Sequence, residues 1–349
     1  MNENEKFIFG RTDLAKDDYE SNNLNDFVDF ENVETNYENI PITKNIIGEK
    51  SSEILNKPRG LYYTIDLTNL NIHDTNTLER IEKAVASVIR EIIDNLSLNN
   101  KKAFVVGLGN SNVTPDAIGP YVIDNTVVTR HLDLMNALSD GFSSVSAMSP
   151  GVMGTTGIET YDIIESVISK IDVDYIIVID ALATTSIKRI NKTIQITDTG
   201  IKPGSGVGNK RKELSKKTLG IPVIAIGVPT VVDATTITVD AIQMVLKYLH
   251  LEKNNKTSKA NKLSPTLLKE DLEQVKNIDN EHLNAYMGAF GMLDEESMRV
   301  LVEEVLTPQG YNLMVTPKEI DVEVEDLSKI IANGINMAVH FGLYEGDSE

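Results

Sequence analysis

Two aspartates stand where a carboxyl group could take part in acid–base chemistry. Asp180 ends the apolar run YIIVID, and Asp116 follows the apolar run KAFVVGLG (102–109) by a few residues. Two carboxyl groups held close together do not easily both ionise, so one of them keeps a proton. Such a pair supplies an acid and a base to one site, which is enough to activate water against a peptide carbonyl. Asp116 and Asp180 are therefore a candidate catalytic pair.

Each aspartate taken alone also has a structural explanation. The segment Thr114-Pro115-Asp116 is a typical start of a helix, and an aspartate after a strand often forms a cap or a turn. The sequence does not show that the two side chains are close to each other. Both interpretations stay open at this point.

Other catalytic chemistries find little support in the residue types. The chain contains no Cys, which excludes disulfides, zinc–thiolate sites and thiol catalysis. No GxSxG nucleophile elbow is present, so serine–histidine catalysis has no motif here. The histidines show no metal-ligand spacing such as HExxH. They are His73, His131, His250, His282 and His340. We therefore expect no cofactor and no metal, while a metal held between carboxylates stays an alternative hypothesis.

The glycine-rich segment GIKPGSGVGNKRK (200–212) is the most unusual part of the sequence. Glycines allow close backbone approach, and a phosphate cradle is one interpretation. However, the segment lacks the Gly-Lys-Ser/Thr ending of a Walker A motif, and Gly107-x-Gly109 lacks the third glycine of a dinucleotide fingerprint. We expect a structural or substrate-positioning loop, with a nucleotide-binding protein as the weaker alternative. Candidate substrate-site residues in the loops are Asn110, Gly151, Gly204, Gly206, Gly208 and Lys210.

The elements that would position these residues alternate between strands and helices. Continuous apolar runs at 102–109, 175–182 and 222–228 predict buried strands, and helical spacing is present at 78–96, 117–136, 158–171 and 232–249. Further strands are expected at 61–68 and 191–197. This alternation predicts an α/β fold with a mostly parallel sheet flanked by helices on both faces. Ligands bind such sheets beyond the carboxyl ends of the strands, which is where both aspartates lie.

The remaining segments are polar or charged. Residues 1–58 are acidic and without sustained periodicity, so we expect mostly loop. An exposed insertion is expected at about 251–285, followed by helices near 294–306 and 325–343. No apolar run is long enough for a membrane span, and no signal peptide is visible at the start. The net charge of −19 disfavours direct binding of nucleic acid.

Several long blocks of the sequence resemble the germination protease family. They are VVGLGNSNVTPDAIGP (105–120), VTRH (128–131), SPGVMGTTGIET (149–160), IDALAT (179–184), TIQITDTGIKPGSGVGNKRKELS (193–215), PVIAIGVPTVVDATTI (222–237) and NLMVTPKEID (312–321). The resemblance runs from about Arg11 to Gly342 and is weakest at 16–60 and 251–285. It implies an α/β architecture similar to that of hydrogenase maturation proteases.

The resemblance also implies an activity. Members of the family are aspartic-type endopeptidases that degrade small acid-soluble, DNA-binding spore proteins early in germination. They are made as self-processing zymogens in the cytoplasm of the forespore and spore core, and they are thought to be homotetramers. The two proposed catalytic aspartates of the family fall on the motifs TPDA and IDALA, which here contain Asp116 and Asp180.

The resemblance further implies a propeptide of residues 1–13. The matching cleavage bond is Asp13–Leu14, within FGRTDLA (9–15). An acidic residue followed by an apolar one also resembles the cleavage pattern of the family's substrates, so the N-terminus would mimic a substrate. Residues 14–349 would then form a single peptidase domain. Docking of Phe7, Ile8 and Phe9 in the cleft is a further hypothesis for how the zymogen is blocked.

Overall fold

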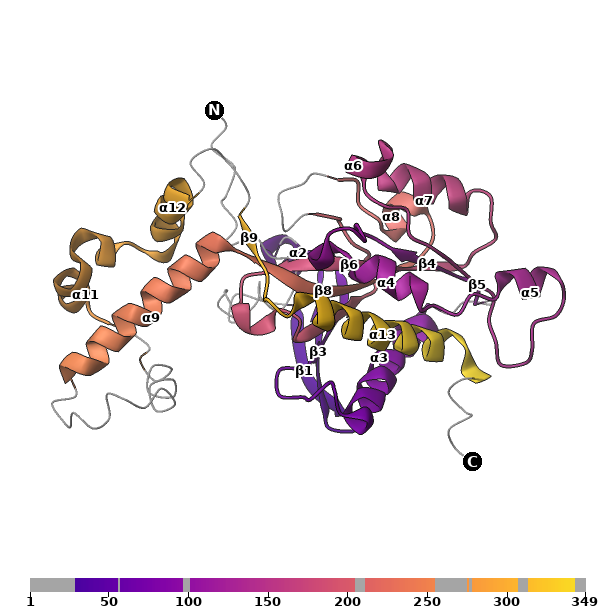
Figure 1. The fold of residues 1–349 in the computed structure, drawn as a ribbon, viewed down its shortest axis with the longest axis horizontal. Coiled ribbons are helices and arrows are strands. Elements are labelled where there is room, and N and C mark those ends of the chain that lie inside the picture. The colour runs from indigo at the N-terminus through magenta and orange to yellow at the C-terminus, as the bar shows by residue number, and fades with distance from the viewer. Residues whose placement is uncertain are drawn as a thin grey trace. The chain divides into compact units, whose positions relative to one another are not determined.

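The computed structural model describes residues 29–55, 57–96, 101–204, 211–254, 275, 278–306 and 313–342. The chain divides into two compact units (Figure 1). The described part of the smaller unit comes from Val232–Val315, and the larger unit contains the described residues before Val232 and from Thr316 onward. No helix in the described ranges combines the length and apolar character that crossing a bilayer requires.

The larger unit is built on a mixed sheet, which confirms the predicted α/β class. The prediction of a mostly parallel sheet is wrong, because β1, β2, β3, β7 and β8 pair with one another in antiparallel fashion and only the part around β4 is parallel. The strand order is β1-β2-β3-β7-β8-β6-β4-β5. β9 pairs with the last two residues of β8, and these residues and β9 fall in the smaller unit. β4 runs parallel to β5 and β6, whereas neighbouring strands from β1 to β8 on the other side pair antiparallel. The strands are β1 (Phe30–Tyr37), β2 (Ile40–Ile47), β3 (Gly60–Asp66), β4 (Ala103–Gly107), β5 (Val145–Met148), β6 (Tyr175–Thr184), β7 (Thr193–Thr197), β8 (Val223–Asp233) and β9 (Met314–Val315).

Helices cover both faces of the sheet around β4 and β6, as their unbroken apolar sequences predict (Figure 1). Alternate side chains enter two separate cores: Val105 and Ile177 face one, and Val106 and Val178 face the other. The first core is completed by α3 (Thr75–Asn95), α4 (Ile118–Asp124) and α13 (Ile320–Val339). The second is completed by α7 (Thr160–Ile168) and by residues around α8 (Lys216–Leu219).

Helix α3 follows the predicted apolar spacing closely. It begins after Asp74, whose side chain accepts a hydrogen bond from the N–H of Thr77 at 2.9 Å. Its apolar face packs against α13, and Gly334 of α13 makes this contact close. A Cβ at Gly334 would lie 2.5 Å from a methyl carbon of Val85. The absence of a side chain at Gly334 therefore sets the spacing of the two helices.

The prediction that residues 1–58 are mostly loop is wrong for residues 30–55. This stretch forms β1, β2 and the helix α2 (Glu49–Leu55). Glu38 and Asn39 link the strands with φ values of 46° and 68°, as in a two-residue hairpin turn. β1 is an exposed edge strand with polar residues on both faces, and it obtains its order by pairing with β2. Its composition therefore looks like that of a loop.

The predicted helix at 117–136 is also wrong in its continuity. The structure has two short helices, α4 and α5 (Arg130–Leu134), with an extended link between them. Two N–H groups of that link form hydrogen bonds with distant parts of the chain. The N–H of Val127 donates to the side-chain oxygen of Asn336 at 2.9 Å, and the N–H of Thr129 donates to the carbonyl of Val145 at 2.9 Å. These tertiary hydrogen bonds replace the bonds of a continuous helix.

The smaller unit is helical. It contains α9 (Ala234–Asn254), α11 (Asn280–Met287), the short 3₁₀ segment η6 (Gly288–Met292) and α12 (Glu295–Leu306). Val239 of α9 packs with Met298 and Val302 of α12 in a small core of its own. Part of the segment predicted as an insertion, residues 280–285, therefore belongs to a helix of this unit.

Candidate active site

The pairing of β4 with β6 sets the position of Asp180. Gly107 pairs with Ile179, and the N–H of Leu108 donates to the carbonyl of Ile179 at 2.8 Å. Asp180 therefore lies at the level where β4 ends. Because Ile179 faces the core formed by α3, α4 and α13, Asp180 faces the opposite side of the sheet. Only 6% of Asp180 is exposed, and the N–H of Ala181 donates to its Oδ1 at 3.0 Å.

Asp116 is positioned by the loop that leaves β4. It ends the 3₁₀ turn η2 (Thr114–Asp116), which begins with a proline in its first turn. The N–H of Asn110 donates to the carbonyl of Asp116 at 2.9 Å, which folds the loop back on itself. The hydroxyl of Thr230 on β8 donates to the carbonyl of Pro115 at 2.7 Å, and η2 also contacts β6. The turn is thus held against the neighbouring strands β6 and β8.

Two glycines make this arrangement possible. Gly109 has φ +109°, and a Cβ there would lie 2.0 Å from the carbonyl oxygen of Asp116. A Cβ at Gly107 would lie 2.2 Å from the carbonyl oxygen of Gly119 at the start of α4. The pattern Gly107-x-Gly109 therefore has a packing reason, namely the close approach of β4, η2 and α4. It requires no phosphate ligand.

The two aspartates thus lie at the same end of β4. Asp180 follows the residue that pairs with Gly107, and Asp116 lies over Gly109, so that Oδ1 of Asp116 would be 3.2 Å from a Cβ at that glycine. This placement agrees with the expectation that strand ends converge at one edge of the sheet. The catalytic roles of the two residues stay a prediction.

The carboxyl group of Asp116 has unusual acid–base properties. Burial raises its pKa from 3.8 to about 6, while the positive charge of Arg211 and the N–H of Asn110 act in the opposite direction. A carboxyl group with such a pKa exchanges a proton near neutral pH, which suits general acid–base catalysis.

Among the predicted loop residues, Asn110 and Gly151 shape the strand ends. Oδ1 of Asn110 accepts the N–H of Asn112 at 3.0 Å. Gly151 has φ +73° in the loop after β5, and its carbonyl accepts the hydroxyl of Thr160 at the start of α7 at 3.4 Å. Gly204 has φ +69°, and no contact between it and the aspartates is seen among the described residues. Gly206, Gly208 and Lys210 lie outside the described residues, as do the predicted propeptide residues Phe7, Ile8, Phe9, Asp13 and Leu14.

The ends of the glycine-rich segment are closed by a β-bridge. The N–H of Ile201 donates to the carbonyl of Leu214 at 2.9 Å, and the reverse bond is 2.8 Å long. Leu214 is fully buried in the core that contains Val106 and Val178, on the same side of the sheet as Asp180. A Cβ at Gly200 would lie 2.1 Å from the carbonyl oxygen of Leu214, which explains that glycine. The segment is therefore anchored on the side of the sheet that Asp180 faces.

Arg211 was not singled out from the sequence. It stands between Lys210 and Lys212 in a basic run, and no local pattern distinguishes the three residues. The structure separates them, because Lys212 pairs with Asp162 whereas the charge of Arg211 acts on Asp116.

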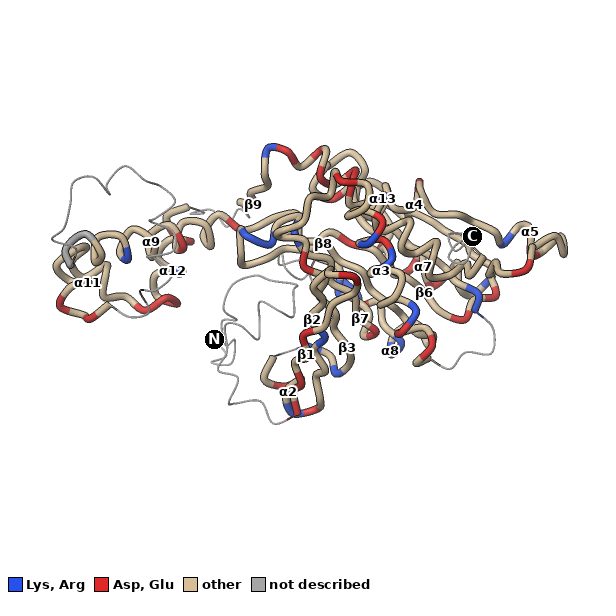
Figure 2. The backbone as a smooth tube through the Cα atoms, turned by 90° about the horizontal axis from the view of Figure 1, so that it is seen from below, with Lys and Arg blue, Asp and Glu red and all other residues tan. Residues whose placement is uncertain are grey.

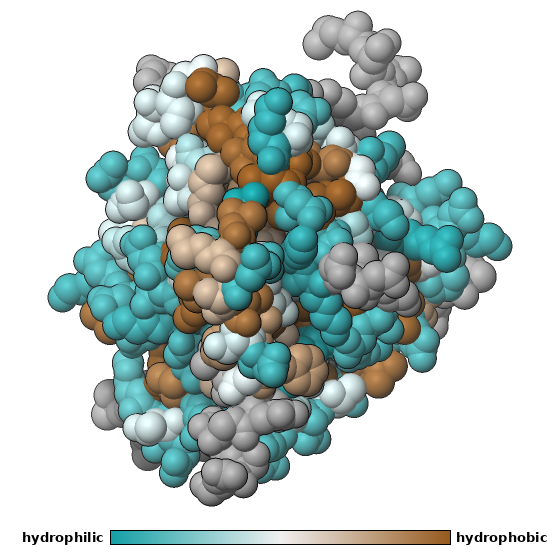
Figure 3. Space-filling model, turned by 90° about the vertical axis from the view of Figure 1, so that its right-hand side faces the viewer, coloured by the Kyte–Doolittle hydropathy of each residue, from teal (hydrophilic) through white to brown (hydrophobic). Residues whose placement is uncertain are grey.

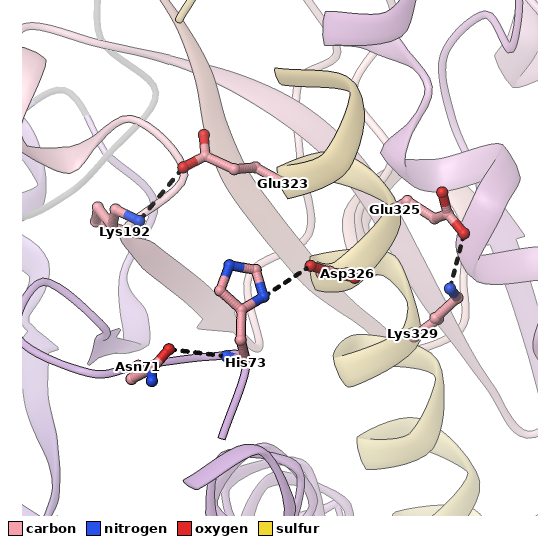
Figure 4. A network of polar contacts seen from close by, with 7 residues as sticks. All are labelled: Asn71, His73, Lys192, Glu323, Glu325, Asp326 and Lys329. Atoms are coloured by element: carbon pink, nitrogen blue, oxygen red, sulfur yellow. Dashed lines mark hydrogen bonds and ion pairs between the residues drawn. The ribbon is translucent and has the colours of Figure 1, made fainter. Parts of the chain in front are cut away.

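Helix α13, which contacts η2, is fixed to its neighbours by polar contacts of its first turns (Figure 4). Glu323 accepts a hydrogen bond from the side chain of Asn191 at 2.7 Å and pairs with Lys192 at 3.4 Å. Asp326 lies 3.5 Å from Nδ1 of His73. These contacts tie α13 to the segment that follows β6 and to the segment that precedes α3.

The histidines of the larger unit have positions unrelated to the aspartates. His340 is buried, its Nε2 lies 3.1 Å from the carbonyl of Val127, and its Nδ1 accepts the N–H of Ser143 at 3.3 Å. His131 is exposed on α5. Among the described residues, no three or more His, Cys, Asp or Glu side chains gather in a way that could hold a metal ion.

Comparison with known proteins gives one consistent result. A model of the germination protease family matches residues 10–349. The germination protease of Bacillus mycoides is 48% identical over 312 residues, which are 87% of this chain and 84% of that protein. Those of Bacillus cytotoxicus and Bacillus cereus are 48% identical over 310 residues, with the same coverage of 87% and 84%. The chain therefore belongs to the germination protease family.

Proposed function

We propose that this chain is an aspartic-type endopeptidase, made as a self-processing zymogen, that begins the degradation of small acid-soluble DNA-binding spore proteins during germination. Membership of the germination protease family supports the peptidase activity and the link to germination. The observation that carries the mechanism is the half-buried carboxyl of Asp116, whose pKa is raised to about 6, at the same strand end as the buried Asp180.

In the proposed mechanism one aspartate acts as general base on a water molecule and the other acts as general acid on the scissile peptide. The ionised carboxylate removes a proton from the water, and the water oxygen bonds to the carbonyl carbon of the scissile peptide. The protonated carboxyl hydrogen-bonds to the carbonyl and gives its proton to the leaving nitrogen, so that the C–N bond breaks into an acid and an amine. Two interacting carboxyls titrate jointly, so the roles belong to the pair.

The proposal includes the organisation of the chain. Residues 1–13 form the propeptide, cleavage occurs at Asp13–Leu14, and residues 14–349 form the peptidase domain. The enzyme acts in the cytoplasm of the forespore and spore core. Acidic residues are spread over both units (Figure 2). Negative charge disfavours binding to DNA phosphates, so the enzyme would not compete with its substrates for DNA.

The proposed assembly is a homotetramer. Apolar side chains lie among polar ones on the face of the molecule that carries α5 (Figure 3), and Leu134 and Met135 there are 66% and 70% exposed. Such side chains are a surface that a subunit contact would cover. Light scattering of the chain and of a Leu134→Asp variant tests this: a monomeric wild-type protein would contradict the proposal.

The central experiment uses Asp116→Asn and Asp180→Asn. Both variants are assayed for self-processing and for cleavage of a small acid-soluble spore protein, and both should lose at least about 10³-fold in kcat/KM if acid and base act together. Full activity of either variant would remove that residue from the mechanism. A parallel assay after exhaustive chelation separates this mechanism from a carboxylate–metal peptidase.

The matched control is Asp198→Asn. Asp198 is also a half-buried aspartate, and partial burial raises its pKa, but its Oδ1 accepts the N–H of Leu61 at 2.8 Å. Asp198 directly follows Thr197, which pairs with Ala225 on β8. Ala225 lies five residues before Thr230, the β8 residue that holds the turn of Asp116. Because Asn keeps a side-chain acceptor, this control should retain activity. If Asp198→Asn retains activity while Asp116→Asn and Asp180→Asn lose it, the loss results from the candidate site and not from removal of an aspartate in general.

A further inference from the structure

Thr230 is a buried polar residue at the end of an apolar row of β8. Alternate residues of this strand enter the core that α3, α4 and α13 complete; they are Ile224, Ile226 and Val228. Thr230 is the next position on the same face, where an apolar side chain would continue the row. It is 0% exposed and carries a hydroxyl. Burial of a hydroxyl costs free energy unless it forms a hydrogen bond, so the partner of Thr230 indicates its role.

That partner is the backbone next to Asp116. Oγ1 of Thr230 donates to the carbonyl of Pro115 at 2.7 Å, and Pro115 directly precedes Asp116. Other backbone hydrogen bonds of this turn are internal to it. The N–H of Asp116 donates to the carbonyl of Val113 at 2.8 Å, and the N–H of Asn110 donates to the carbonyl of Asp116 at 2.9 Å. The hydrogen bond from Thr230 instead connects the turn to a strand of the sheet.

A second hydroxyl holds Thr230 itself. Oγ1 of Thr316 donates to the carbonyl of Thr230 at 2.9 Å. The chain leaves the larger unit after Val231 and returns to it at Thr316. Two hydrogen bonds in series therefore connect the residue at which the chain re-enters the larger unit with the turn that carries Asp116.

We propose, on the basis of the proposed function, that Thr230 is a positioning residue for Asp116 and that Thr316 acts on Asp116 through Thr230. The hydroxyl of Thr230 fixes the carbonyl of Pro115 and thereby the position of the Asp116 carboxyl at the end of β4. Threonine suits this role, because its branched side chain has few rotamers. A general acid or base must lie within hydrogen-bond reach of the reacting atoms, and a displacement of about 1 Å can lower the rate about 100-fold.

The test compares three variants in kcat and KM for one peptide substrate. Thr230→Val keeps the shape of the side chain and removes the oxygen, so kcat should fall about 10- to 100-fold while KM stays unchanged. Thr230→Ser keeps a hydroxyl and should recover most of the activity. Thr193→Val is the matched control and should retain the wild-type kcat. Thr193 is 2% exposed on the neighbouring strand β7, and its hydroxyl has no hydrogen-bond partner in the part of the chain that the structure describes.

A double-mutant cycle tests the connection between the two threonines. Thr316→Val alone should lower kcat about 5-fold, the equivalent of one hydrogen bond between uncharged groups. In the Thr230→Val background the hydrogen bond to the turn is already lost, so addition of Thr316→Val should change kcat by less than about 2-fold. Effects that multiply in full would contradict action of Thr316 through Thr230.

The outcomes separate the role of Thr230 from the proposed function. If folded Thr230→Val keeps the wild-type kcat while Asp116→Asn is inactive, the positioning role is refuted and the aspartate mechanism stands. An equal loss of kcat in Thr193→Val would also refute the role, because removal of another buried hydroxyl would then have the same effect. An active Asp116→Asn variant would refute the proposed function and the role of Thr230 with it. If circular dichroism shows that Thr230→Val does not fold, the half-buried Thr316 decides, and an unchanged kcat in Thr316→Val would refute the proposal.

Discussion

Replacement of Asp116 by Asn should stabilise the folded protein in a pH-dependent manner. Burial raises the pKa of Asp116 from 3.8 to about 6, so its ionised form is disfavoured in the native state. A group with a raised pKa contributes its full share of stability below the unfolded value of 3.8 and loses it as the pH rises through about 6. At about 1.36 kcal/mol for each pH unit between the two values, the ionised carboxyl costs at most about 3 kcal/mol above pH 7. Asparagine carries no such cost.

Urea unfolding at several pH values measures this effect. The difference in the free energy of unfolding between Asp116→Asn and the wild type should grow between pH 4 and pH 7 and then level off. Asp124→Asn, at the exposed end of α4, serves as the control for the loss of one negative charge from an acidic protein. After subtraction of this control, a difference that does not change with pH would refute the assignment of a raised pKa to Asp116.

Three further predictions follow from features of the larger unit and the N-terminus. Gly109→Ala should destabilise the fold by at least about 1–3 kcal/mol and abolish activity, because its φ is +109° and its Cβ would lie 2.0 Å from the carbonyl oxygen of Asp116. Denaturation and activity assays measure both effects. Gly154→Ala is the control in the same assays, because a Cβ added at Gly154 would meet no atom within 4 Å. Deletion of residues 1–13 should give an active enzyme without processing, and a folded but inactive truncation in a cleavage assay would contradict the blocking role of that segment. Burial lowers the pKa of His340, so the stability that its neutral form contributes is present above about pH 6.5 and is lost as the pH falls below that value. In thermal unfolding, the melting temperature of His340→Gln should therefore fall less on acidification than that of the wild type.

The sequence was sufficient to predict the elements that carry their own local signal. The strands β4, β6 and β8 are continuous apolar runs, and the spacing of Ile81, Val85 and Ile89 marks α3. Because strand ends carry functional residues in such sheets, the same reasoning led to Asp116 and Asp180.

The features that were missed depend on contacts distant in the sequence. The edge strand β1 has a polar composition and obtains its order from β2, so its own residues give no strand signal. The break between α4 and α5 depends on Asn336, more than two hundred residues away. In each case the deciding partner is invisible to a local pattern.

The bridge between Ile201 and Leu214 also gives the glycine-rich segment an asymmetric tolerance to changes in chain length. Only two residues separate Arg211 from Leu214, and an inserted residue there would displace the guanidinium by up to about 3.5 Å. On the Gly204 side of Arg211, added residues lengthen a closed loop, and doubling such a loop costs only about 0.6 kcal/mol. Among related chains, deletions and insertions should therefore accumulate before Arg211, and the distance from this arginine to the buried leucine should stay constant.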